Sequence, residues 1–260
     1  MEHANGRKSI FITGAASGMG LETAMLFAGQ GWFVGGYDVN GPGIDGLRAE
    51  LGSQNGVFEV LDVTDRKAYA AALDRFGQAT GGRLDILFNN AGIVRGGPFA
   101  EQDFDDILAV VNVKLVGVLN GIRLALSLLK ATPGSLCFST SSSSAIFGAA
   151  GIAVYSATKH AVKGLTEALS VELAPLGIRV ADVLPGLIDT PILPREWADN
   201  APADGMWRLI PPVEVARVVW RAYAEDRVHW YVPEDLFAYD AEVTADPVGT
   251  RNRILAGRAS

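Results

Sequence analysis

The stretch Ser9-Ile-Phe-Ile-Thr-Gly-Ala-Ala-Ser-Gly-Met-Gly20 decides the fold of this chain. An apolar run typical of a strand leads into closely spaced glycines, and a helical pattern follows over residues 21–30. Glycines let the backbone approach a phosphate, and a helix N-terminus supplies amide donors and positive potential. The spacing is Gly-x-x-x-Gly-x-Gly, and no lysine follows as a P-loop requires. The stretch therefore predicts a loop that binds the pyrophosphate of a dinucleotide.

Further apolar runs alternate with helical patterns along the chain. The runs lie at residues 9–13, 32–38, 57–61, 84–89, 136–140 and 178–184, and long helical stretches cover residues 104–130 and 153–174. Such alternation predicts βαβ units with right-handed crossovers and a doubly wound parallel sheet with helices on both faces. Because the composition does not shift midway, we expect one α/β domain over residues 1–260.

Composition limits the classes of function. A net charge of −7 argues against binding to nucleic acid or to an anionic membrane. The longest apolar run is shorter than the roughly 18–20 residues that span a bilayer, and the N-terminus lacks the pattern of a secretory signal. One cysteine, Cys137, and three histidines give no metal-binding motif. We expect a cytoplasmic protein without a metal site.

Asp38 ends the second apolar run, Trp32-Phe-Val-Gly-Gly-Tyr-Asp38. A carboxylate at this distance from the glycine loop accepts hydrogen bonds from the adenosine ribose and repels a 2′-phosphate. Neither the loop nor residues 37–41 contain an Arg or Lys that would hold such a phosphate. The cofactor predicted is therefore NAD rather than NADP. The alternative is that Asp38 only caps the turn before Asn40-Gly41.

Tyr155 and Lys159 are four residues apart and so share one face of a helix. An ammonium group beside a tyrosine favours the phenolate and lowers its pKa from about 10. The pair therefore predicts an acid/base for an alcohol or a carbonyl group. Taken without its surroundings, the same spacing is also common on exposed helix surfaces.

Residues 187–212 form an irregular segment that contains several prolines and the tryptophans Trp197 and Trp207. Long irregular segments inside compact domains tend to be functional or disordered. We interpret this segment as a substrate-binding loop or lid within the single domain, and an ordinary surface loop is the alternative.

The chain resembles the short-chain dehydrogenase/reductase family over about residues 8–192. The resemblance rests on the glycine loop, Asn89-Asn-Ala-Gly92, Asn112, the serine run 141–144, Tyr155-x-x-x-Lys159 and Pro185-Gly186. It implies a single Rossmann-type domain with a sheet of about seven parallel strands, the last near residues 228–232. It also implies hydride transfer between a nicotinamide and a carbonyl or alcohol.

The resemblance assigns catalytic roles to Asn112, Ser142, Tyr155 and Lys159. Tyr155 is the expected acid/base, and Lys159 lowers its pKa while binding the nicotinamide ribose. Ser142 hydrogen-bonds the substrate oxygen, with Ser141 and Ser143 as competing candidates. Asn112 distorts its helix and helps to hold a water molecule linked to the lysine, or else is a paired structural asparagine.

The resemblance and the motifs also give two larger sets of residues. The expected cofactor-binding residues are Gly14, Ser17, Gly18, Met19, Gly20, Asp38, Asp62, Val63, Asn89, Ala91, Gly92, Tyr155, Lys159, Pro185, Gly186, Ile188 and Thr190. The expected substrate pocket consists of Val94, Ser142, Ile146, Phe147, Ile192, Leu193, Trp197 and Trp207. These mostly apolar side chains indicate a hydrophobic secondary alcohol or ketone, either cyclic, aromatic or steroid-like.

The function predicted is therefore an NAD-dependent short-chain alcohol dehydrogenase or ketone reductase with a small-molecule substrate. We expect a homodimer or homotetramer. The alternatives are an NADPH-dependent reductase of the ketoacyl type and a non-catalytic nucleotide-sensing protein on the same fold.

Overall fold

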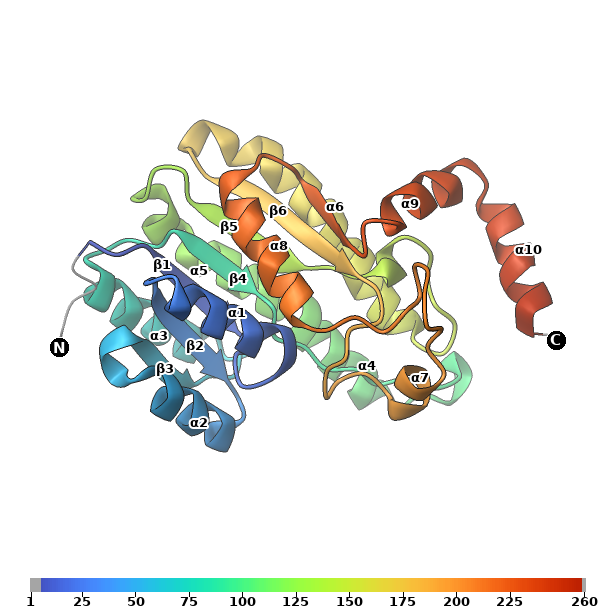
Figure 1. The fold of residues 1–260 in the computed structure, drawn as a ribbon, viewed down its shortest axis with the longest axis horizontal. Coiled ribbons are helices and arrows are strands. Elements are labelled where there is room, and N and C mark those ends of the chain that lie inside the picture. Colours follow the sequence, from blue (N-terminus) through green and yellow to red (C-terminus); the bar gives the residue numbers. More distant parts are fainter. Residues whose placement is uncertain (1–5, 259–260) are drawn as a thin grey trace.

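The computed structural model describes residues 6–258 and has a central parallel sheet between two layers of helices (Figure 1). Seven strands form the sheet in the order β3-β2-β1-β4-β5-β6-β7. They are β1 (Ser9–Thr13), β2 (Phe33–Asp38), β3 (Gly56–Val60), β4 (Ile86–Asn89), β5 (Leu136–Thr140), β6 (Arg179–Pro185) and β7 (His229–Val232). The expected α/β architecture is confirmed, and the six predicted runs match β1 to β6 to within two residues at each end.

Helices cover both faces of this sheet. They are α1 (Gly18–Gly29), α2 (Gly41–Leu51), α3 (Arg66–Thr80), α4 (Phe104–Val111), α5 (Gly117–Lys130), α6 (Ala153–Glu172), α7 (Arg195–Asp199), α8 (Val213–Ala224), α9 (Leu236–Ala245) and α10 (Pro247–Arg258). One apolar core joins the sheet to α1, α2 and α8, and includes Phe27 and Val219. The other joins the opposite face to α3, α5 and α6, and includes Tyr69 and Ile122.

The order of the strands explains where a ligand can bind. The chain leaves β1 toward β2 and β3 on one side, and then returns to place β4 on the other side of β1. Because successive connections diverge there, the carboxyl ends of β1 and β4 leave a crevice between their loops. The glycine loop after β1 and the residues after β4, β5 and β6 meet at this crevice.

Residues 104–130 form one continuous helix, in which a π-helical turn (Asn112–Val116) joins α4 to α5. By length and composition alone, this helix is apolar enough to cross a membrane. In the fold it packs against α3, α6, β4 and β5, and it buries the charged side chain of Lys114 near its middle. These contacts are those of a core helix in an α/β domain.

The C-terminal part of the chain departs from the compact body. α9 lies beside β7, while α10 extends away from the rest of the molecule (Figure 1). An ion pair of 2.6 Å between Arg253 and Glu242 connects α10 to α9. The segment after β7 is thus helical, and it borders the same end of the sheet as the crevice.

Candidate active site

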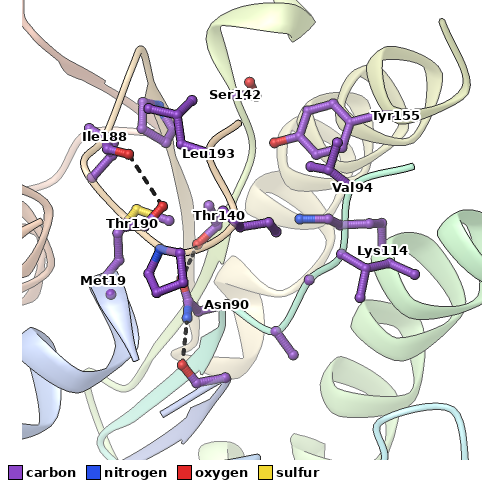
Figure 2. Close-up of a pocket in the computed structure, with 18 of the residues that line it drawn as sticks. Met19, Asn90, Val94, Lys114, Thr140, Ser142, Tyr155, Ile188, Thr190 and Leu193 are labelled. Atoms are coloured by element: carbon purple, nitrogen blue, oxygen red, sulfur yellow. Dashed lines mark hydrogen bonds between the residues drawn. The ribbon is translucent and has the colours of Figure 1, made fainter. Parts of the chain in front are cut away.

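A cavity of about 410 Å³ opens at the carboxyl ends of the strands. Its walls come from the glycine loop, the ends of β2, β4, β5 and β6, the start of α6 and the segment 187–212. Figure 2 shows the side chains of Ser142, Tyr155 and Lys114 directed toward the interior of this cavity. Residues far apart in the sequence are therefore brought to one site.

The glycine loop forms one wall of the cavity, and its shape depends on the absence of side chains. Gly14 and Gly18 have φ angles of +69° and +53°, which only glycine adopts readily. A Cβ atom on Gly20 would lie 2.0 Å from the carbonyl oxygen of Gly14. Because α1 begins at Gly18, its free amides face the cavity. This wall suits the pyrophosphate of a dinucleotide.

Asp38 lies at the end of β2 and lines the cavity. Its two carboxylate oxygens accept hydrogen bonds from the backbone amides of Ala16, at 3.1 Å, and Asn40, at 2.9 Å. Asp38 therefore ties the glycine loop to the turn before α2. Its hydrogen bond with Asn40 is the capping role that was considered above as the alternative. Since each oxygen has a second lone pair, the carboxylate also retains acceptor capacity toward a ribose.

Tyr155 stands in the first turn of α6, and Ser142 begins the short 3₁₀ turn after β5. The hydroxyl group of Ser142 hydrogen-bonds the phenol of Tyr155 and lowers its pKa, while burial raises it. Ser142 also accepts a hydrogen bond from the amide of Ser144 at 3.1 Å, which fixes its side chain. Ser141 instead donates to the carbonyl oxygen of Lys159, so it is directed away from Tyr155.

Two buried lysines lie beside the ring of Tyr155. The Nζ atom of Lys114 is 4.9 Å from the ring centroid, and that of Lys159 is 5.5 Å away. The ammonium of Lys159 donates to the carbonyl oxygen of Thr140 at the end of β5. Neither lysine has a carboxylate within ion-pair distance in the described part of the chain. The site thus places two buried amines beside one phenol.

Burial controls the protonation of these three groups. It lowers the pKa of Lys114 to about 8, and it lowers the pKa of Lys159 well below its ordinary value, where the neighbouring Lys114 charge adds to the effect of burial. Burial raises the pKa of Tyr155 above its ordinary value. This direction is opposite to the one expected from the sequence, because the lysine charges that would favour the phenolate are themselves weakened by burial.

Asn112 begins the π-helical turn that distorts its helix, but its side chain lies outside the cavity. This side chain is exposed. Lys114 is 5% exposed and lies four residues after the buried Val110, on the same face of the helix. Asn112 is two residues from Val110 and therefore lies about 200° around the helix. The residue that contacts Lys159 from this helix is Lys114.

Other expected site residues differ in how they contribute. Most of them line the cavity, whereas Gly20, Asn89, Ile146 and Lys159 do not. Gly20 supports the glycine loop from behind, and Lys159 lies behind Tyr155. Asn89 accepts a hydrogen bond from the hydroxyl group of Tyr69. Ile146 packs in an apolar cluster with residues of β6, β7 and α9 and does not line the cavity, whereas the neighbouring Phe147 does.

Two further residues organise the site. Asn90 donates from its amide to the carbonyl oxygens of Thr13 and Gly14, at 3.1 and 3.2 Å, and so joins β4 to the glycine loop. Lys114 was passed over in favour of Asn112. A signal for Lys114 was available, because Val110, Lys114 and Val118 recur every four residues and all three are buried.

These groups together support oxidoreductase chemistry. The glycine loop can hold a dinucleotide, Tyr155 can exchange a proton with an oxygen atom, and Ser142 can hydrogen-bond the same oxygen. The cavity beyond them is lined by the apolar side chains of Val94, Phe147, Ile152, Leu193 and Trp207. Fold and site define an oxidoreductase of the Rossmann type.

Comparison with known proteins gives the family. The sequence model of the short chain dehydrogenase family matches residues 8–201, so the chain belongs to the short-chain dehydrogenase/reductase family. The chain is 37% identical to the 3-oxoacyl-(acyl-carrier-protein) reductase FabG of Thermotoga maritima, over 82% of this chain and 88% of that protein. It is 32% identical to the cyclohexanol dehydrogenase of Acinetobacter sp., over 87% and 91% of the two chains.

Solved structures agree with this assignment. A short-chain dehydrogenase/reductase of Burkholderia phymatum in complex with NAD superimposes with a TM-score of 0.80 at 26% identity, covering 92% of this chain and 94% of that one. The 3-ketoacyl-(acyl-carrier-protein) reductase of Brucella melitensis, complexed with NADH, gives a TM-score of 0.78 at 28% identity over 86% and 96%. The relatives therefore support a nicotinamide cofactor for this fold.

Proposed function

We propose that this protein is an NAD(H)-dependent oxidoreductase that interconverts a hydrophobic secondary alcohol and its ketone. The observation that carries the proposal is the convergence of Tyr155, Ser142 and the glycine loop on one largely apolar cavity. When bound, the nicotinamide supplies the hydride chemistry. The residues of this chain bind and orient the two reactants, and they move the proton.

In the oxidation direction, Tyr155 takes the proton of the alcohol, and in the reduction direction it returns a proton to the carbonyl oxygen. Ser142 hydrogen-bonds the same oxygen, where charge develops as the carbon loses or gains a hydride. Gly14, Ser17 and Gly18 hold the pyrophosphate, while Ile188 and Thr190 bind the nicotinamide end. Thr190 is oriented by a hydrogen bond to the carbonyl oxygen of Ile188 at 3.2 Å.

The proposed preference for NAD rests on Asp38. Asp38, Asp62 and Lys114 are the charged side chains among the described residues that line the cavity, and no arginine does so. The one cation among them, Lys114, lies beside the ring of Tyr155. A 2′-phosphate next to Asp38 would meet a carboxylate with no cation to offset it, and like charges at such distances cost several kcal/mol.

We expect the protein to bind NADH at least about tenfold more tightly than NADPH, because each 1.4 kcal/mol corresponds to a factor of ten. Asp38→Asn removes the charge but keeps an oxygen acceptor for the Ala16 amide. It should therefore strengthen NADPH binding and narrow the difference between the NADH and NADPH affinities. Titration of tryptophan fluorescence with each cofactor measures both affinities. Asp45→Asn, an exposed carboxylate of α2 paired with Arg48, is the control. Tighter binding of NADPH by the unaltered protein would overturn the assignment.

The proposed substrate class follows from the lining of the cavity. Trp197 and Trp207 belong to the segment 187–212, which an isolated bridge between Ile188 and Ile210 closes into a loop. We propose that this loop is the substrate-binding lid, and that its apolar side chains select a cyclic, aromatic or steroid-like compound. Relatives named as hydroxysteroid and cyclohexanol dehydrogenases support the same class.

One relative supports a second candidate substrate. The 37% identity with a 3-oxoacyl-(acyl-carrier-protein) reductase favours reduction of a ketoacyl group. That reading, with NADPH as the reductant, requires a cation for the 2′-phosphate, and none lies near Asp38 among the cavity residues described above. A nucleotide-sensing protein without catalysis is disfavoured because Tyr155, Lys159 and Ser142 are all present and close together.

We also propose that the protein is a cytoplasmic homo-oligomer. The outer face of α4 and α5 exposes Phe104, Leu108, Val116 and Leu119. An apolar stripe of this kind on a long helix suits burial against a second copy, as a homodimer or within a homotetramer.

A further inference from the structure

We propose that Lys114 is a second proton-exchanging lysine of the active site, which shares a proton with Lys159 and releases the proton of the reaction into the cavity. The proposal rests on the oxidoreductase function proposed above. It concerns a residue that the family resemblance did not assign, and it follows from the surroundings of Lys114.

The π-helical turn directs Lys114 into the site. Turns of this kind are rare inside α-helices and frequently occur at functional sites. The turn buries the side chain of Lys114, and a Cβ atom on Gly92 would lie 1.9 Å from its Nζ atom. Residue 92 therefore has to be glycine for Lys114 to reach the cavity in this conformation.

Lys114 keeps its place at a cost in free energy. Burying an ammonium group without a carboxylate partner is unfavourable, and in the described residues no carboxylate lies within 4.0 Å of it. Titratable groups surround the pair on several elements: Tyr155 on α6, Asp182 on β6, whose charge acts on Lys159, and Asp38 and Asp62 farther along the cavity. A buried, unpaired group in a cleft of this kind is characteristic of a functional residue.

The two lysines cannot both hold a full charge. Burial lowers the pKa of both amines; contact between the two side chains offsets this in part for Lys114, whereas the charge of Lys114 adds to it for Lys159. In the proposed pair Lys114 therefore holds the proton, and Lys159 is the neutral amine that can accept one. Lys114 also lines the cavity, whereas Lys159 lies behind Tyr155. The pair thus has an inner acceptor next to the phenol and an outer group that can exchange with solvent.

The proton balance of the oxidation needs such a pair. A secondary alcohol loses a hydride from carbon, for which a bound nicotinamide would be the acceptor, and a proton from oxygen, which passes to the hydroxyl oxygen of Tyr155. As Tyr155 takes this proton, it gives its own hydroxyl proton, through a water molecule, to the neutral amine of Lys159, because the lysines lie over the ring rather than in line with the hydroxyl group. Lys114 gives a proton to water in the cavity, and one proton is released in total.

The first test needs no substrate and no cofactor. Carbon-13 NMR of lysine-labelled protein follows each lysine side chain through a pH titration, and loss of one signal in Lys114→Met assigns Lys114. We expect Lys114 to titrate near pH 8, below the ordinary range of lysine side chains, and the midpoint of Lys159 to rise in Lys114→Met because the neighbouring charge is removed. Midpoints above 10 for Lys114 in the unaltered protein would overturn the proposal, whether or not the variant folds.

The second test uses turnover with NAD and a cyclic secondary alcohol. Below its pKa Lys114 is charged, so oxidation should accelerate as the pH rises through about 8. In Lys114→Met this acceleration should disappear, and kcat should fall about tenfold or more. Added methylamine should restore part of the lost kcat. Lys130→Met on α5 is the control, and Lys114→Gln replaces the Met variant if that protein is unstable. An unchanged pH profile in an active Lys114 variant would refute the role of Lys114, whereas absence of activity in both the native protein and Lys130→Met would refute the proposed function instead.

Discussion

Replacing Tyr155 with phenylalanine should abolish most turnover and leave cofactor binding intact. The substitution removes only the hydroxyl group that Ser142 hydrogen-bonds, and the ring that packs over Lys114 and Lys159 remains. General acid/base assistance contributes about 10² to 10⁴ in rate, so kcat should fall by a factor in this range. Initial rates of NADH formation and fluorescence titration with NADH separate the loss in kcat from any change in affinity.

Tyr223→Phe provides the matched control. Tyr223 belongs to α8 and donates to Asp85 at 3.0 Å, outside the cavity. Its variant should keep nearly normal kcat, because only a structural hydrogen bond worth about 1 kcal/mol of stability is lost. If Tyr155→Phe keeps a kcat similar to that of Tyr223→Phe on the same substrate, Tyr155 is not the acid/base.

Replacing Gly20 with alanine should damage cofactor binding through the shape of the glycine loop. The new Cβ atom would lie 2.0 Å from the Gly14 carbonyl oxygen, so the backbone must move, and 2.8 Å from the side-chain nitrogen Nδ2 of Asn90. Overpacking of this kind costs about 1–3 kcal/mol, which corresponds to a loss of about tenfold to hundredfold in affinity. Isothermal titration with NADH measures this loss directly.

Gly29→Ala separates this effect from the general effect of alanine in a helix. Gly29 ends the same helix, α1, and a Cβ atom there meets nothing within 4 Å. Alanine has the higher helix propensity, so Gly29→Ala should bind NADH normally and be equally or slightly more stable. Normal NADH affinity in a folded Gly20→Ala protein would show that the loop does not hold the cofactor in this conformation.

The sheet could be predicted from the sequence because its signals are local. The run from Ser9 to Thr13 is buried at every position, and a strand covered on both faces reads as a continuous apolar run. The glycine loop and Asp38 were predictable for a similar reason, since their spacing after each strand brings them to the same edge of the sheet. The rest of the topology could be predicted from the alternation of apolar runs and helical patterns along the chain.

The interior of the site was less predictable because it depends on packing between distant elements. Asn112 matched a short family motif, but the face of the helix that turns inward carries Val110, Lys114 and Val118. The raised pKa of Tyr155 and the lowered pKa values of the lysines arise from burial among α5, α6 and β5, which spacing alone does not reveal. The inward packing of Ile146 against the segment after β7 likewise required the position of α9.

The central claim is that this cavity oxidises and reduces hydrophobic alcohols and ketones with NAD(H). The most direct measurement is the initial rate of NADH formation from a series of cyclic, aromatic and steroid secondary alcohols, with NAD and NADP supplied separately and Tyr155→Phe in parallel. The account predicts turnover that is faster with NAD than with NADP and is lost in Tyr155→Phe. Turnover only with NADP, or equal rates in the native protein and Tyr155→Phe, would contradict it.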